Sequence, residues 1–135
     1  MINDALVYPM LAHVLLVFAL YGLLTVARAP SVWGIGALKD GSNPWKTIEP
    51  RISANLSNQF EWPLFFYVVS LIAIVQGMAG SAILVWLSWL FVGGRIFHSG
   101  VQILTTNIRL RGLVFTINFL AVLGMWVCVA FTNVT

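Results

Sequence analysis

The stretch AILVWLSWLFVGGRIFHSGVQIL, residues 82–104, decides the fold class of this chain. It is predominantly apolar and long enough to cross the roughly 30 Å hydrocarbon core of a bilayer, which takes roughly 20 helical residues. Three comparable runs lie at about residues 5–27, 56–75 and 113–131. These runs are continuous and do not alternate between apolar and polar residues, so they favour helices over barrel strands. The sequence therefore predicts an all-α membrane protein, a bundle of four transmembrane helices.

The composition supports a lipid environment for these runs. Hydrophobic residues make up 60% of the 135-residue chain and charged residues only 8%, whereas soluble domains average about 25% charged residues. A chain of this length is predicted to form one domain over residues 1–135, and small domains keep much of their surface exposed. So much apolar surface cannot be hidden from water in so small a core, and lipid is therefore the predicted solvent.

The positive charges are unevenly distributed along the chain. Six of the seven Lys and Arg residues fall in two predicted loops: Arg28, Lys39, Lys46 and Arg51 in loop 28–51, and Arg109 and Arg111 before the fourth helix. Because Lys and Arg concentrate in cytoplasmic loops, both loops are predicted to be cytoplasmic and both termini to lie outside. This rule accounts for the net charge of +3, so nucleic acid is not a predicted partner.

Polar residues form two stripes inside the predicted membrane region. Those on the second helix, spaced by three and therefore on one face, are Asn55, Asn58 and Glu61. Those on the third helix, which fall within roughly 60° of one another, are Arg95, His98, Gln102 and Arg109. Ionisable residues in spanning helices usually face the bundle interior and mark functional sites. The two stripes therefore form the predicted site.

Depth along the helices suggests which of these residues meet. At 1.5 Å per residue, Glu61 lies about 15 Å from the cytoplasmic side, level with His98 and one turn from Arg95. Opposite charges at this depth are expected to pair, because an isolated buried charge costs several kcal/mol. A purely structural ion pair explains Glu61 and Arg95 equally well. Arg109 is the stronger functional candidate, since a thiolate or carboxylate of a soluble ligand can reach the cytoplasmic end of the helix.

The other polar residues of the predicted spans have simpler interpretations. His13 is interpreted as a packed or interfacial histidine, because no polar partner stands at helical spacing from it. Cys128, the single cysteine, is interpreted as a small apolar packing residue, and no metal site is predicted. Arg111 is interpreted as an anchor to the cytoplasmic membrane surface.

Two motifs resemble those of a known family. The pattern Arg51-x6-Asn58-x2-Glu61-x-Pro63 is similar to the signature of the membrane-associated proteins in eicosanoid and glutathione metabolism (MAPEG). The pattern Arg95-x2-His98-x10-Arg109 resembles the second motif of that family. Size, four spans and basic cytoplasmic loops agree as well. The spacing of Glu61 and Pro63 looks closer to bacterial members, which implies a bacterial inner membrane.

The resemblance implies a homotrimer that binds glutathione between neighbouring subunits, near the cytoplasmic face. The glutathione-binding residues that it implies are Arg28, Arg51, Asn58, Glu61, Arg95 and His98. It assigns to Arg109 the catalytic role of stabilising the glutathione thiolate. The implied activity is that of a glutathione transferase or peroxidase, and the implied substrates are lipophilic electrophiles or lipid hydroperoxides that arrive from the bilayer.

Departures from the family pattern keep other functions open. Ala54 stands where many members have a second arginine, and His98 and Gln102 stand where glutathione-binding members often have tyrosines. A non-catalytic MAPEG-like protein with a binding or scaffold role is therefore a serious alternative. A small multidrug-type transporter is a weaker one, because such transporters usually carry their glutamate in the first helix and this chain has none there.

Overall fold

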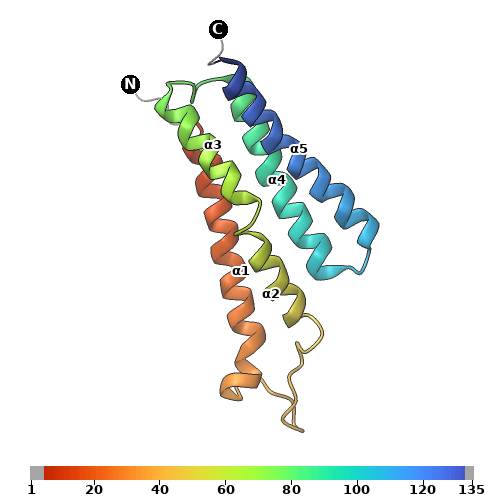
Figure 1. Cartoon of the computed structure of the whole chain (residues 1–135). Helices are drawn as coiled ribbons and strands as arrows, with labels where there is room; N and C mark the ends of the chain where they lie inside the picture. The colour runs from red at the N-terminus through yellow and green to blue at the C-terminus, as the bar shows by residue number, and fades with distance from the viewer. Residues whose placement is uncertain (1–4, 133–135) are drawn as a thin grey trace.

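The computed structural model describes residues 5–132, and over this range the chain is helical without any strand (Figure 1). The helices are α1 (Val7–Trp33), α2 (Glu49–Asn58), α3 (Pro63–Val75), α4 (Ala82–Leu104) and α5 (Ile108–Thr132). Four segments of this range are long and apolar enough to cross a membrane, and α2 and α3 together make the second of them. The predicted all-α fold with four membrane-spanning helices is confirmed. Residues 1–4 and 133–135 of the predicted domain lie outside the described range.

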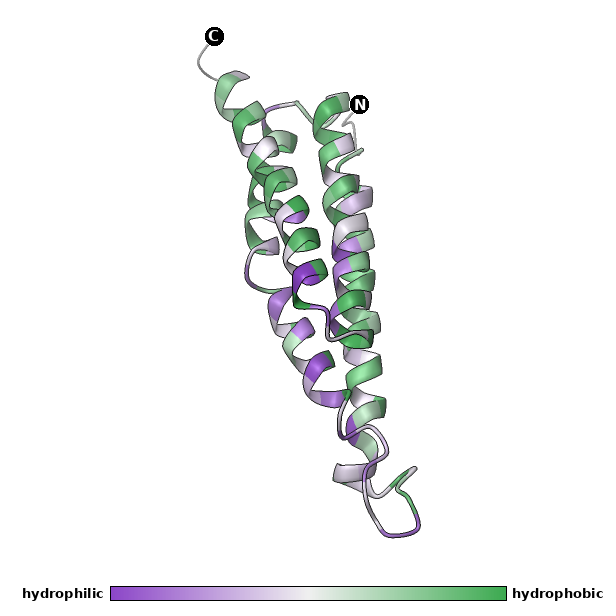
Figure 2. Cartoon of the chain, turned by 90° about the vertical axis from the view of Figure 1, so that its right-hand side faces the viewer, coloured by the Kyte–Doolittle hydropathy of each residue, from purple (hydrophilic) through white to green (hydrophobic). Residues whose placement is uncertain are grey.

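The helices form an elongated bundle with a polar end and an apolar end. α4 packs along α5, α1 packs against α2 and α4, and α3 packs against α5. Figure 1 shows that the α1–α2 and α4–α5 connections lie at the end of the bundle opposite the start of α1 and the end of α5. The two basic regions therefore share one side, as their charges predicted. Figure 2 shows hydrophilic residues gathered toward that same end. The assignment of that side to the cytoplasm remains a prediction.

The first two helices extend beyond the apolar runs, so the predicted loop 28–51 was too long. α1 continues through Pro30 to Trp33 and ends at Gly34, whose φ is 68° and whose N–H donates to the carbonyl of Pro30. α2 begins at Glu49, which leaves residues 34–48 as the connection. Hydropathy detects only the part of a helix that lies in hydrocarbon, and a helix can continue into the polar layer where water satisfies its end.

The second span is broken inside the membrane region, so the prediction of one helix over residues 56–75 is wrong. α2 ends at Asn58 and α3 begins at Pro63. Proline has no N–H to donate to the carbonyl four residues earlier, and its ring clashes with that carbonyl. Such a break is tolerated in a membrane where other groups satisfy the freed backbone or where it lines a cavity. The side chains around this break form the candidate site.

Close packing of α4 against α5 depends on Gly94. A Cβ atom at this position would collide with Oδ1 of Asn118, a side chain that is completely buried. We therefore expect Gly94→Ala to destabilise the protein by about 1–3 kcal/mol, the usual cost of overpacking a filled core. Unfolding in detergent, followed by circular dichroism, measures this loss.

The neighbouring glycine is the matched control for this substitution. A Cβ atom at Gly93 would meet no atom within 4 Å, so Gly93→Ala is expected to leave stability nearly unchanged. Adding Asn118→Ala to Gly94→Ala should restore most of the loss, since the Asn118 amide has no hydrogen-bond partner among the described residues. Equal stabilities of the two glycine variants would contradict the proposed contact.

Candidate functional site

A buried arginine occupies the break in the second span. Arg95, on α4, is only 1% exposed. Its Nε donates to Oε1 of Gln59 at 3.1 Å, and its Nη2 donates to the backbone carbonyl of Asn58 at 3.1 Å. The carbonyl of Asn58 would normally bond the N–H of Trp62 within a continuous helix. The guanidinium thus satisfies a backbone group that the break at Pro63 leaves available.

Glu61 and Arg95 do not form the predicted ion pair in direct contact, although the Glu61 charge acts on Arg95 from a longer distance. Glu61 lies in the non-helical segment between α2 and α3 and is exposed, and the described residues contain an ion pair only between Arg28 and Glu49. The predicted stripe also fails at Glu61, because the helix that carries Asn55 and Asn58 ends before it. The neutral acceptors of Gln59 and Asn58 take the positions around Arg95 that Glu61 was expected to fill.

Amide side chains join α2 to α4 on the side of Arg95 nearer the α4–α5 connection. Oε1 of Gln102 accepts hydrogen bonds from Nδ2 of Asn55 at 2.9 Å and from Nδ2 of Asn58 at 3.2 Å. Nε2 of Gln59 donates to the carbonyl and the Oδ1 of Asn55 and to Oγ of Ser99. Gln59 was not among the predicted site residues, although its spacing of four from Asn55 is a helical signal.

Two adjoining cavities lie beside these amides. Their volumes are about 400 and 370 Å³. Both cavities are lined by Gln102, Ile108 and Arg111. The first is also lined by Asn58, His98 and Phe115. The second is also lined by Arg51, Ala54 and Thr105. The combined space is of the size that small-molecule sites have.

His98 lines the first cavity and carries a buried polar atom without a hydrogen-bond partner among the described residues. The side chain is 3% exposed, and its Nδ1 has no hydrogen-bond partner within residues 5–132. Buried polar atoms without a partner are uncommon in proteins and call for an explanation. This nitrogen is fully buried, so a ligand in the cavity would reach it only after the imidazole ring turned.

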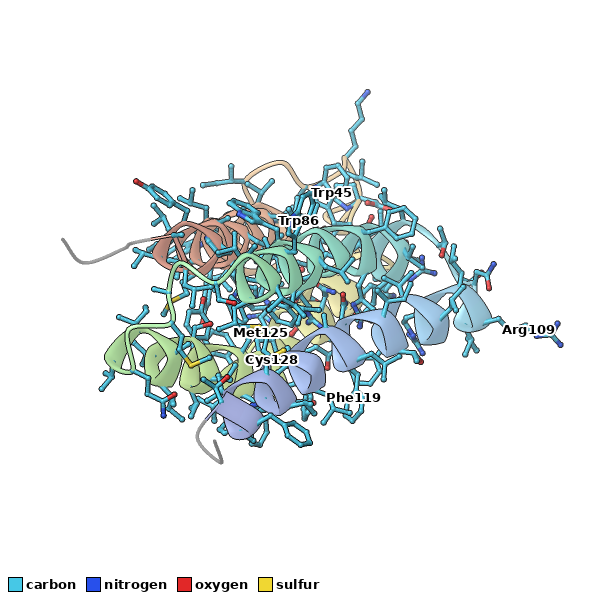
Figure 3. All side chains as sticks on the ribbon, turned by 90° about the horizontal axis from the view of Figure 1, so that it is seen from above. Trp45, Trp86, Arg109, Phe119, Met125 and Cys128 are labelled. Carbon is cyan, nitrogen blue, oxygen red and sulfur yellow. The ribbon has the colours of Figure 1, made fainter. Side chains whose placement is uncertain are left out.

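The two arginines at the start of α5, Arg109 and Arg111, do not occupy the positions that the sequence predicted for them. α4 ends at Leu104 and α5 begins at Ile108, so Arg109 does not continue the stripe of Arg95 and His98, and that part of the prediction is wrong. Arg109 is exposed and projects from the start of α5 away from the bundle (Figure 3). Arg111, which was interpreted only as an anchor, lines both cavities.

The residues between the two helices change the helical phase. Thr105 has an extended backbone, with φ −128° and ψ 165°. Oδ1 of Asn107 then accepts the N–H of Leu110 at 3.0 Å, as a helix N-cap does. A new helix therefore starts in a new direction, and spacing counted from α4 no longer predicts which side chain faces the cavities.

Arg51 and Arg28, the other basic residues of the predicted site, lie in different parts of the structure. Arg51 lines the second cavity, and its Nη1 donates to the carbonyl of Ile103 at 3.5 Å. Arg28 lies outside both cavities, where its Nε donates to Glu49 at 2.7 Å and its Nη2 to Ser53 at 3.2 Å. The cavities of one chain thus bring together Arg51, Arg111, amide groups and His98, a set suited to an anionic, peptide-like ligand.

Comparison with known proteins gives one match. The model of the MAPEG family matches residues 6–131, which is nearly the whole chain. No curated protein and no solved structure matches the chain.

Proposed function

The chain belongs to the MAPEG family, and from this membership we propose that it is a membrane-embedded, glutathione-dependent transferase or peroxidase. The family includes glutathione transferases and peroxidases as well as non-catalytic members, and it generally uses glutathione. The proposed substrates are lipophilic electrophiles or lipid hydroperoxides that reach the protein through the bilayer. The observation that carries the proposal is the pair of adjoining cavities at which Arg51, Arg111, Asn58 and His98 come together.

The chemistry requires the thiolate form of glutathione. A free thiol has a pKa of about 8.5, so only a few per cent is ionised at neutral pH. An arginine keeps its charge, and a fixed cation near the sulfur lowers the pKa of the thiol. We assign this role to Arg111, because it lines both cavities. Arg109, the residue that the sequence favoured, stays the second candidate, and it would act on glutathione bound by a neighbouring subunit.

The proposed assembly is a homotrimer with glutathione between subunits. MAPEG proteins are generally oligomeric and membrane-embedded, and this chain is an integral multi-pass membrane protein of that family. Arg28 and Glu61, which line neither cavity of their own chain, are proposed to contact glutathione bound between subunits. We further propose that the site faces the cytoplasm of a bacterial inner membrane.

A non-catalytic binding role is the second candidate, and the amide network favours it. Nδ2 of Asn58 donates to Gln102 at 3.2 Å, so this motif residue is already engaged within the chain. Ala54, which lines the second cavity, offers no charge to a carboxylate. A ligand would have fewer donors to bind here than in members that carry an arginine and tyrosines at the corresponding positions.

Glutathione is expected to raise the thermal stability of the purified oligomer. A ligand that binds only the folded state stabilises it by about 2.7 kcal/mol at a hundredfold excess over Kd. The midpoint of thermal unfolding, followed with increasing glutathione, measures this effect. Arg51→Ala, which removes a cation from the second cavity, should shrink the shift.

Lys39→Ala is the matched control, because it removes a cation from the connection 34–48 and lines neither cavity. This variant should keep the full glutathione-dependent shift. The tripeptide in which alanine replaces the cysteine of glutathione should give a smaller shift, since it lacks the thiolate. If saturating glutathione does not shift the midpoint of the wild-type protein, the proposed function is wrong.

A further inference from the structure

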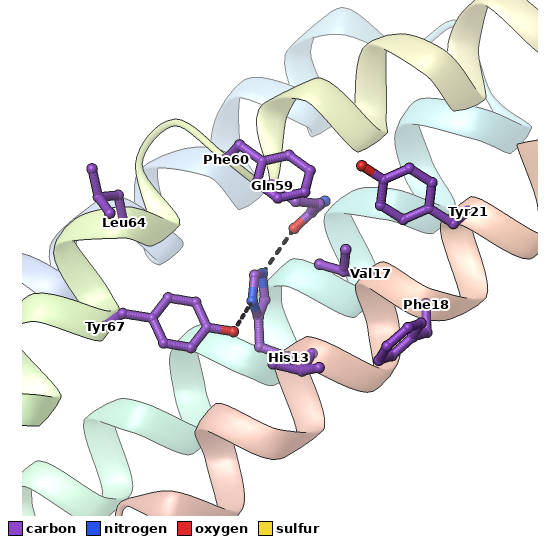
Figure 4. Close-up of a pocket in the computed structure, with 9 residues that line it drawn as sticks. His13, Val17, Phe18, Tyr21, Gln59, Phe60, Leu64 and Tyr67 are labelled. Carbon is purple, nitrogen blue, oxygen red and sulfur yellow. Dashed lines mark hydrogen bonds between the residues drawn. The ribbon is translucent and has the colours of Figure 1, made fainter.

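A third cavity lies beside the break between α2 and α3, and most of the side chains that line it are apolar or aromatic. Its volume is about 470 Å³, and it is lined only by α1 and the second span, with no residue in common with the two cavities above. Figure 4 shows Phe18, Tyr21 and Phe60 around a floor formed by His13, Gln59 and Tyr67. Phe18 is 69% and Phe60 59% exposed, so the cavity opens sideways, at the level of the membrane.

The hydrogen bonds of the floor determine where its protons lie. Nε2 of Gln59 donates to the carbonyl and the Oδ1 of Asn55, so the amide orientation leaves Oε1 facing Nε of Arg95 at 3.1 Å and Nε2 of His13 at 3.0 Å. An amide oxygen only accepts, and His13 Nε2 must therefore carry a proton. A second cation beside buried Arg95 is unfavourable, so the ring is neutral and its Nδ1 is an acceptor.

Tyr67 consequently has an oxygen that lacks a donor. Its hydroxyl lies 2.8 Å from Nδ1 of His13 and donates its single proton there. The other polar atom near this hydroxyl, the carbonyl of Met10 at 3.4 Å, is also an acceptor and has no proton to offer. Within the described part of the chain, nothing donates to this oxygen. An acceptor among apolar side chains gains free energy when a ligand donates to it.

We propose that this cavity binds a lipophilic molecule that carries a hydroxyl group, such as an alkylphenol or a long-chain alcohol. The ligand O–H donates to the oxygen of Tyr67, and the apolar body packs against Phe18, Tyr21 and Phe60. From His13 to Tyr21 the cavity extends about 12 Å along α1, at 1.5 Å per residue. Entry is lateral, from the bilayer, and requires no glutathione.

The test compares 4-octylphenol with 4-octylanisole, which has the same body but a methyl group in place of the donated proton. The chain contains three tyrosines, Tyr8, Tyr21 and Tyr67, so ¹³C labelling of the tyrosine ring carbon that bears the hydroxyl gives few signals. The oligomer is titrated in nanodiscs without glutathione. Signals of Tyr21 and Tyr67 should shift and that of Tyr8 should not. The phenol should bind about three- to tenfold more tightly, the usual worth of one neutral hydrogen bond.

Two variants separate the hydrogen bond from the space. Tyr67→Phe should lower the affinity for the phenol to that for the anisole, with Tyr21 as the reporter, whereas Tyr8→Phe should leave both affinities unchanged. Val17→Trp fills the cavity without touching its hydrogen bonds and should abolish binding of both compounds. Equal affinities of phenol and anisole for the wild-type protein would overturn the proposal. Equal shifts of all three tyrosine signals would also overturn it. The proposal would fail as well if a second subunit occupied the cavity and neither compound could bind.

Discussion

Arg95→Ala is expected to destabilise the folded protein by about 3 kcal/mol or more, the largest loss of stability among the substitutions considered. It would leave the carbonyl of Asn58 buried without a donor, which costs about 1–3 kcal/mol, and would open a cavity that costs a further few kcal/mol. Gln59 would keep its bond to His13 but lose the one to Arg95. Reversible unfolding in mixed detergent micelles, followed by tryptophan fluorescence, gives the free energy of unfolding.

Glu61→Gln is the control for this prediction. Glu61 is exposed and lies in the non-helical segment, so its neutral analogue should change stability by less than about 0.5 kcal/mol. Arg95→Lys should recover only part of the loss, because an ammonium does not reproduce the fixed fork of a guanidinium. A larger loss for Glu61→Gln than for Arg95→Ala would show that a carboxylate contact, rather than the amide and carbonyl contacts, holds Arg95.

Arg111→Ala is expected to lower glutathione-dependent turnover at neutral pH by about a hundredfold or more, the usual effect of losing one charge-stabilising donor. Without the cation, the pKa of the bound thiol rises toward its free value, so less thiolate is present at pH 7. Because thiolate forms as pH increases, the activity of the variant should recover at alkaline pH. Turnover of a lipophilic electrophile and the ultraviolet absorbance of the bound thiolate, both measured against pH, test this expectation.

Arg109→Ala is the matched comparison, since both arginines lie in the first turn of α5 and only Arg111 lines the cavities. If Arg111 is the functional cation, Arg109→Ala should keep nearly full turnover and the wild-type thiolate spectrum. The reverse pattern would assign the role to Arg109 of a neighbouring subunit. Unchanged spectra in both variants, with glutathione bound, would favour the non-catalytic function.

Some features of this protein follow directly from its sequence. Apolar runs such as residues 82–104 had to be membrane-spanning helices, because backbone groups in hydrocarbon must be satisfied internally. The charge distribution placed both basic regions at one end of the bundle. Helical spacing also identified members of the polar cluster, such as Asn55, Asn58 and His98, because Asn55 and Asn58 lie together on α2 and His98 lies with Arg95 and Gln102 on α4.

The partners of these residues depended on the tertiary structure. Helical spacing predicts a shared face only while the helix continues, and the breaks at Pro63 and at residues 105–107 end that relation for Glu61 and Arg109. Beyond a break, the direction of the next helix is set by its packing against its neighbours, as α5 is set against α4 and α3. The contacts of His13 with Gln59 and Tyr67 likewise depend on how α1 is rotated against the second span, a relation between distant segments that no local spacing contains.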